Sequence, residues 1–146
     1  MNWNELSAED AENHPAYGFG GGLLICYALI ALWVLHSVYL LVFDTNYALA
    51  KWYGYENYTM VDFTNFLQIV LALPFLYLAP RKSPTMPSIA ISCLSVNWTI
   101  WFAFGMISPL AVPISLTVTA ITVGVVVFLF RSERVNVTYQ HRARTA

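Results

Sequence analysis

The amino-acid sequence predicts an all-α integral membrane protein, a four-helix antiparallel bundle with residues 1–146 in a single membrane domain. The first observation is composition: 58% of the residues are hydrophobic and 10% are charged, whereas a typical soluble domain has about 25% charged residues. The second is that four apolar segments approach the length of about 20 residues that a helix needs to cross a membrane. So few charges argue against a soluble enzyme and a disordered chain, and the net charge of −1 argues against a nucleic-acid-binding protein.

The four apolar segments are expected to be helices, because backbone amides in lipid must be hydrogen-bonded within the protein. A barrel would need strands of about 10 residues with alternating polarity, and these segments are longer and do not alternate. The second segment is the shortest and holds Pro74, which should kink it. Pro109 and Pro113 fall where the last helix begins, a position that proline tolerates. The predicted spans are residues 20–43, 63–78, 88–107 and 110–130.

The distribution of Lys and Arg predicts the orientation of the chain in the membrane. Four crossings place the leader of residues 1–19 and the tail of residues 131–146 on one side, together with Arg81 and Lys82. The tail adds four Arg, whereas the other side has only Lys51, so both termini are predicted to be cytoplasmic. The leader is acidic and has no Lys or Arg, so it is not expected to be a cleaved signal peptide. It could instead pair with the basic tail.

An aromatic loop is expected on the outer side, between the first two spans. Aromatic rings with a polar tip prefer the headgroup zone of a bilayer, so the loop is interpreted as an interfacial anchor. A docking surface for a partner, or a lid over an aromatic ligand, is the alternative. The loop covers residues 44–62, and its aromatic residues are Tyr47, Trp52, Tyr53, Tyr55 and Tyr58.

Two stretches of the chain resemble motifs of one protein family. Gly20–Ile25 resembles a G-G-W-L start of a first membrane helix, with Gly22 where the family has Trp. Arg131–Tyr139 resembles an S-K-R-V-K-N-T-F signature after a fourth helix, with Asn136 and Val137 in place of Lys and Asn. The chain is thus similar to a family of small bacterial four-helix inner-membrane proteins of unknown function. The resemblance implies a bacterial inner membrane and supplies no activity.

His36 is the one His, Asp, Glu, Lys or Arg within the predicted spans, and such a group in a membrane is a functional hypothesis by default. At about 1.5 Å per residue, His36 lies about 10 Å below the outer end of its helix. Gln68 and Thr117 lie at about the same depth on other helices. We therefore expect a polar cluster of these three residues inside the bundle. It could fix packing through hydrogen bonds, relay a proton or a substrate, or ligate haem in a dimer.

A second polar layer is expected near the middle of the membrane. Asn97 and Trp98 on the third span lie at nearly the same depth as Thr119 and Thr122 on the fourth. Hydrogen bonds between helices are the common use of such groups, and a polar cavity of the kind that transporters use is the alternative. Small residues at helical spacing predict close helix packing or dimerisation, and on the third span these are Ser88, Ser92, Ser95 and Thr99.

The sequence contains no catalytic motif and no metal-ligand spacing, so no catalytic residue, metal or cofactor is predicted and the chain is not expected to be an enzyme. The first hypothesis is a non-catalytic accessory or assembly subunit of a membrane complex. Its predicted partners are the lipid bilayer and either another membrane protein or a second copy of the chain, but not nucleic acid. The alternatives are a small oligomeric transporter of a neutral or apolar solute and a redox subunit that binds haem or quinone.

Overall fold

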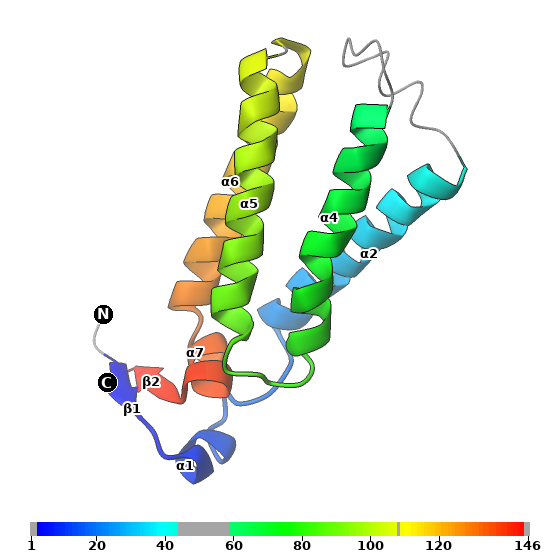
Figure 1. Cartoon of the computed structure of the whole chain (residues 1–146). Helices are drawn as coiled ribbons and strands as arrows, with labels where there is room; N and C mark the ends of the chain where they lie inside the picture. Colours follow the sequence, from blue (N-terminus) through cyan, green and yellow to red (C-terminus); the bar gives the residue numbers. More distant parts are fainter. Residues whose placement is uncertain (1–2, 44–58, 108, 145–146) are drawn as a thin grey trace.

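The computed structural model describes residues 3–43, 59–107 and 109–144, and this part of the chain is mostly helical (Figure 1). The predicted all-α class is therefore confirmed, with two short strands in addition. The helices are α1 (Ala8–Glu12), α2 (Gly22–Val42), α4 (Thr59–Leu78), α5 (Met86–Ile107), α6 (Val112–Arg131) and α7 (Glu133–Gln140). The strands are β1 (Trp3–Glu5) and β2 (Arg142–Arg144), and a 3₁₀ turn, η1 (Pro109–Ala111), precedes α6.

Four long helices occupy the predicted apolar segments. α2 packs against α4 and α5 packs against α6, and the two pairs meet mainly through α4 and α5 (Figure 1). In the described part of the chain, α2, α5 and α6 are long and apolar enough to cross a membrane. The apolar part of α4, Asp62–Leu78, is shorter. The helices thus support a membrane protein by their length and composition.

The three prolines discussed above lie in the segments predicted from the sequence. Pro74 is inside α4, which continues to Leu78. Pro109 begins η1, and Pro113 is in the first turn of α6. A proline in a first helical turn costs no hydrogen bond, because the amides there have no partner within the helix. The start of α6 is therefore compatible with both residues.

The leader and the tail fold together into one structure at one end of the helices. We call this structure, residues 3–19 and 132–144, the terminal cap. β1 and β2 pair antiparallel, with Glu5 opposite Arg142, and the amide of Leu6 donates to the carbonyl oxygen of His141 at 2.8 Å. The expected pairing of leader and tail is thus confirmed, as a backbone ladder.

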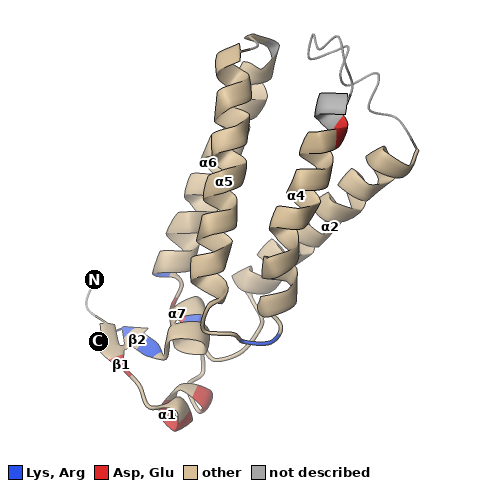
Figure 2. Cartoon of the chain, in the orientation of Figure 1, with Lys and Arg blue, Asp and Glu red and all other residues tan. Residues whose placement is uncertain are grey.

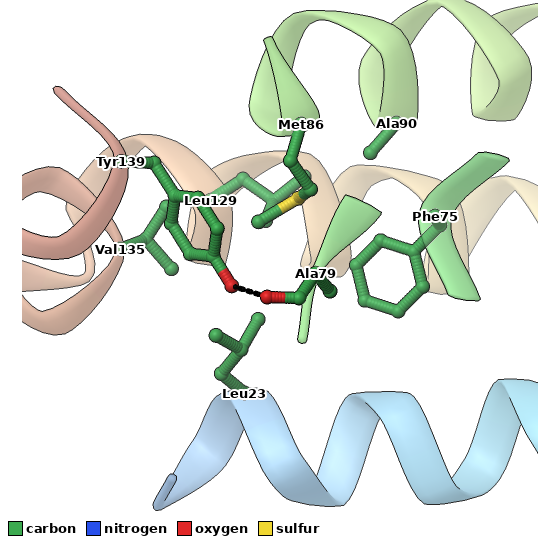
Figure 3. Close-up of a cluster of buried hydrophobic side chains, with 8 residues drawn as sticks. All are labelled: Leu23, Phe75, Ala79, Met86, Ala90, Leu129, Val135 and Tyr139. Atoms are coloured by element: carbon green, nitrogen blue, oxygen red, sulfur yellow. Dashed lines mark hydrogen bonds between the residues drawn. The ribbon is translucent and has the colours of Figure 1, made fainter. Parts of the chain in front are cut away.

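A cluster of buried hydrophobic side chains lies where the terminal cap meets the four long helices (Figure 3). The hydroxyl of Tyr139 on α7 donates a hydrogen bond to the carbonyl oxygen of Ala79, just after α4, at 2.7 Å. One bond thus connects the cap to the α4–α5 turn, and side chains from every long helix close around it. The cluster consists of Leu23, Phe75, Ala79, Met86, Ala90, Leu129, Val135 and Tyr139.

Away from the cap, the outward faces of the long helices are mostly apolar. Large hydrophobic side chains on all four are exposed, including Leu29 on α2, Phe66 on α4, Phe102 on α5 and Val123 on α6. The described Lys and Arg residues gather at the cap end of the molecule (Figure 2). The predicted aromatic loop falls on residues 44–62, of which 44–58 lie outside the described residues.

Candidate functional site

The first polar contact between spans joins α2 to α4. Gln68 on α4 is buried, and the indole N–H of Trp33 on α2 donates to its side-chain oxygen at 2.8 Å. Gln68 is therefore in the interior, as predicted, but its partner is Trp33 rather than His36. The sequence does contain a signal for this, because an indole N–H is a donor with no acceptor role and needs an oxygen wherever water is excluded. Trp33 itself is half-exposed, and its N–H reaches the buried Gln68.

The other two residues of the predicted cluster are not brought to Gln68. His36 is on an exposed face of α2, and Thr117 is on an exposed face of α6. The Thr117 hydroxyl donates to the carbonyl oxygen of Pro113, one turn earlier in the same helix, at 2.9 Å. Equal depth places the three residues in one layer, but it does not fix the direction in which each helix turns them.

The second polar contact joins α5 to α6. The indole N–H of Trp98 donates to the hydroxyl of Thr119 at 2.9 Å, and that hydroxyl donates in turn to the carbonyl oxygen of Ser115 at 2.8 Å. The expected hydrogen bond between the middles of these helices is confirmed for this pair. Asn97, beside Trp98, is half-buried. In each helix pair, a tryptophan N–H on one helix thus donates a hydrogen bond to a side-chain oxygen on the other.

The helices α5 and α6 also approach each other closely at Gly105, two turns after Trp98. A Cβ atom on Gly105 would lie 2.8 Å from the Cβ atom of Ser115, closer than two carbon atoms can approach, so only glycine allows this contact. Beside it lies a groove of about 230 Å³. The groove is lined by Trp98, Phe102, Gly105, Met106, Val112, Ser115, Leu116 and Thr119.

The predicted line of small residues on α5, from Ser88 to Thr99, does not face α6. Ser92, Ser95 and Thr99 are exposed, and each hydroxyl donates to the carbonyl oxygen four residues earlier in α5, at 2.8–3.0 Å. Ser88, at the start of the same line, is exposed as well. Such bonds let a hydroxyl lie on an apolar surface with its donor satisfied. The stripe is therefore an outward surface of this chain rather than a seam within it.

Backbone amide and carbonyl groups take part in several hydrogen bonds of the terminal cap. Gly18 has a φ of +105°, which a residue with a side chain rarely adopts, and its amide donates to the hydroxyl of Thr138 at 2.9 Å. The guanidinium of Arg134 donates to the carbonyl oxygens of Tyr17 and Gly18 at 3.3 and 3.4 Å. Lys82 lies over the ring of Tyr17 at 4.3 Å. Hydrogen bonds and a cation–π contact thus connect the leader, the tail and the α4–α5 turn.

Three titratable residues of the cap have structural roles. Burial raises the pKa of the Tyr139 phenol well above its ordinary value, because the charged form would lose its hydration. His14 accepts from the amide of Ala16 at 3.1 Å, and His141 ends α7 with a φ of 50°. Within the described ranges, no three His, Cys, Asp or Glu side chains gather as a metal site would need.

Comparison with known proteins identifies no relative: no protein-family model matches the chain, and no curated protein or solved structure matches it. The contacts described above therefore carry the functional argument. Sequence reasoning found Gln68, Trp98 and Thr119. It missed Trp33, Arg134 and Tyr139, whose partners lie far away in the chain.

Proposed function

We propose that this protein crosses the inner membrane of a bacterium four times, with both termini in the cytoplasm. We further propose that it serves as a non-catalytic accessory or assembly subunit of a membrane complex. Three helices of sufficient length and apolarity support the crossings. For the fourth, α4 supports the proposal because it packs beside α2 and α5 and exposes Phe63, Phe66 and Leu73.

The charges support the orientation. Arg81 and Lys82 lie in the α4–α5 turn, beside the terminal cap and its Arg residues. Basic residues near the membrane favour the cytoplasmic side, where anionic lipids add about 1 kcal/mol for each. The bacterial inner membrane follows from the resemblance of Gly20–Ile25 and Arg131–Tyr139 to a bacterial family.

One observation carries the proposed role: polar side chains lie on outward faces of the spans. His36 on α2 and Ser92, Ser95 and Thr99 on α5 are exposed. In a lone bundle these groups would contact hydrocarbon, which is unfavourable for an imidazole in particular. Small polar residues are also typical of surfaces where membrane helices meet. A partner in the membrane would cover both faces, as expected of a subunit.

The interior polar groups support a structural rather than a chemical role. Gln68 is used by Trp33 and Thr119 by Trp98, each in a bond between neighbouring helices. Such bonds hold membrane helices together. The interior polar groups that a path for a solute would need are thus engaged in bonds between helices.

Affinity purification in a mild detergent tests the role. The wild-type chain is expected to retain a membrane protein at fixed stoichiometry. Ser95→Leu should lose that partner, because a bulky side chain would separate the two helix surfaces. Val96→Leu is the matched control, since Val96 is the next residue and is 48% exposed, and it should retain the partner. Partners that bind both variants equally, or no partner at all, would contradict the proposal.

Labelling with a membrane-impermeant maleimide tests the orientation. The two native cysteines, Cys26 and Cys93, are first replaced by Ser, since both are free thiols. Lys51→Cys should then react in intact spheroplasts, and Gln140→Cys only after the membrane is permeabilised. Reaction of both from the same side would overturn the four crossings.

The groove between α5 and α6 favours one alternative, a carrier of an apolar solute. Its volume of about 230 Å³ is smaller than that of most ligand pockets, but its largely apolar walls suit a small apolar molecule. The expected signature is uptake into liposomes that Met106→Trp, which fills the groove, abolishes. If Met106→Trp does not reduce uptake, or if the wild-type chain takes up no solute, the subunit role is the better proposal.

A further inference from the structure

A group of basic side chains lies at the ends of the long helices, next to the terminal cap. α4 ends at Leu78 and α6 ends at Arg131, and every member of the group lies within four residues of one of these two ends. If the helices cross the membrane as proposed, that is the level at which hydrocarbon gives way to lipid headgroups. We call this group the basic rim, and it consists of Arg81, Lys82, Arg131 and Arg134.

Arg81 lies at the end of an exposed apolar line on α4. The large side chains of this line follow each other at steps of four and three residues, so they share one face of the helix. The guanidinium of Arg81 lies over the ring of the last of them, 3.7 Å from the ring centre, and donates to the carbonyl oxygen of the same residue at 3.1 Å. The line consists of Phe66, Val70, Leu73 and Tyr77.

Two other cations of the basic rim meet at Tyr17. The ammonium of Lys82 lies 4.3 Å from the centre of the Tyr17 ring, and the guanidinium of Arg134 donates to the Tyr17 carbonyl oxygen at 3.3 Å. In the described ranges, these two side chains and that of Arg81 make their polar contacts with rings and carbonyl oxygens rather than with carboxylates. The acidic residues of α1 lie farther from the long helices (Figure 2). The charges of the rim are therefore available to an anion from outside this part of the chain.

We propose that the basic rim binds an anionic phospholipid at the α4–α5 turn, with the lipid phosphate against Arg81 and Lys82 and an acyl chain along the exposed line of α4. Arg131 and Arg134 add positive charge around the headgroup. The proposal rests on the membrane crossings proposed above, but not on the accessory role. It assigns selectivity for lipids with a net negative charge over zwitterionic ones.

The hydrogen-bond donors of Arg81 and Lys82 suit a phosphate. A guanidinium carries five N–H donors and an ammonium three. The bond to the Tyr77 carbonyl oxygen involves one nitrogen of Arg81, and Lys82 faces a ring through its charge alone. Most of the donors can therefore bind phosphate oxygens in charge-assisted hydrogen bonds, which are the stronger kind.

The apolar line beside these donors selects a lipid over a soluble anion. Tyr77, the residue under the guanidinium of Arg81, is 58% exposed. A free phosphate or an acidic peptide would bind the cations and leave this line uncovered. A phospholipid joins a phosphate to an acyl chain, so one molecule covers both surfaces. Basic sites at the cytoplasmic ends of membrane helices are typical binding sites for anionic headgroups.

Native mass spectrometry of the purified chain in detergent tests the selectivity. Phosphatidylglycerol, which is anionic, and phosphatidylcholine, which is zwitterionic, are added in equal amounts with identical acyl chains. The wild-type chain should retain phosphatidylglycerol with at least tenfold preference, because each basic residue near an anionic lipid contributes about fivefold. Equal retention of the two lipids would overturn the proposal.

Variants that each remove one charge test the location of the site. Arg81→Gln should reduce the preference about fivefold, and Arg81→Lys, which keeps the charge, should retain most of it. Arg142→Gln is the matched control, because Arg142 is exposed on β2, which packs mainly against β1 and α7. This variant should leave the preference nearly unchanged. Equal losses in Arg81→Gln and Arg142→Gln would mean that net charge rather than the rim attracts the lipid, and an equal loss in Arg81→Lys would exclude a role for the charge; either result refutes the site.

Soluble glycerol phosphate distinguishes a lipid from a free phosphate, since it carries the headgroup phosphate without acyl chains. A large excess of it should leave the phosphatidylglycerol bound to the wild-type chain in place, because the line on α4 would still hold the acyl chain. Displacement of the lipid would mean that the rim binds phosphate alone, and the assignment to a lipid would be wrong.

Carbonate extraction from membrane vesicles separates this proposal from the one on which it rests. Resistance of the wild-type chain to extraction is expected if the long helices cross the membrane. Extraction of the chain would mean that the proposed crossings are wrong. A chain that resists extraction and retains both lipids equally would leave the crossings intact and refute the lipid site alone.

Discussion

Replacing Tyr139 by Phe removes one hydroxyl from the junction between the terminal cap and the long helices. The side chain is 1% exposed, and its hydroxyl bonds to the carbonyl oxygen of Ala79 at 2.7 Å. The phenyl ring would keep its packing against the buried cluster. The carbonyl oxygen of Ala79 would lose this donor in a place shielded from water, which costs about 1–3 kcal/mol.

That free energy should appear as local opening of the cap rather than as loss of the whole fold. The proposed spans are held by separate contacts, such as Trp98 to Thr119. Hydrogen exchange measured by mass spectrometry reports local opening. In Tyr139→Phe, the amides of α7 should exchange about 5- to 150-fold faster, the factor that 1–3 kcal/mol implies. The amides of α5 and α6 should be unchanged.

The control is Gln140→Ala, because Gln140 is the next residue of α7 and is exposed. It should leave exchange in α7 within about twofold of the wild type, the size of a typical surface effect. Equal exchange in Tyr139→Phe and the wild type would mean that the bond to Ala79 contributes nothing. Faster exchange throughout α5 and α6 would mean that the cap and the long helices open as one unit.

Three further predictions follow from contacts described above. Because the pKa of Tyr139 is raised in the folded cap, the cap keeps its full stability below about pH 10, the ordinary pKa of a phenol. Above this pH, the protection of the cap amides from hydrogen exchange, corrected for the intrinsic exchange rate, should fall up to tenfold per pH unit. In Tyr139→Phe this fall should be absent. Gly105→Ala should destabilise the α5–α6 pair in thermal unfolding by about 1–3 kcal/mol through overpacking, whereas Gly124→Ala should not, since a Cβ there meets nothing within 4 Å. A double-mutant cycle of Trp98→Phe and Thr119→Val should give a coupling of about 0.6–1.7 kcal/mol, and additive effects would contradict it.

The long helices could be predicted from the sequence because the thickness of a membrane sets their length. The predicted span 20–43 corresponds to α2, Gly22–Val42, and the span 110–130 to η1 and α6. The depth of each residue along its helix could also be predicted, since a helix rises by a constant distance per residue. For that reason the match between Trp98 and Thr119 could be expected before the structure was known.

The direction of each side chain around its helix was harder to predict. His36 and Gln68 share a depth, but α2 turns His36 outward and offers Trp33 to Gln68. Periodicity does not help on a helix that is apolar on all sides. Only the packing of neighbouring helices decides which face is inside, and a single sequence contains little information about that packing.

The terminal cap was the least predictable part. The bond between Tyr139 and Ala79 joins residues 60 positions apart, and the pairing of Trp3 with Arg144 joins the two ends of the chain. A strand of three residues has too little pattern to be recognised locally. A pairing of leader and tail could be suggested from their opposite charges, but not its form as a β-ladder.

The pairing of β1 with β2 has a consequence for the order of events during synthesis. β1 leaves the ribosome first and β2, Arg142–Arg144, leaves after all four long helices. β1 therefore remains without its ladder partner while the four long helices are made. The ladder can therefore close only after α2, α4, α5 and α6 have all been made.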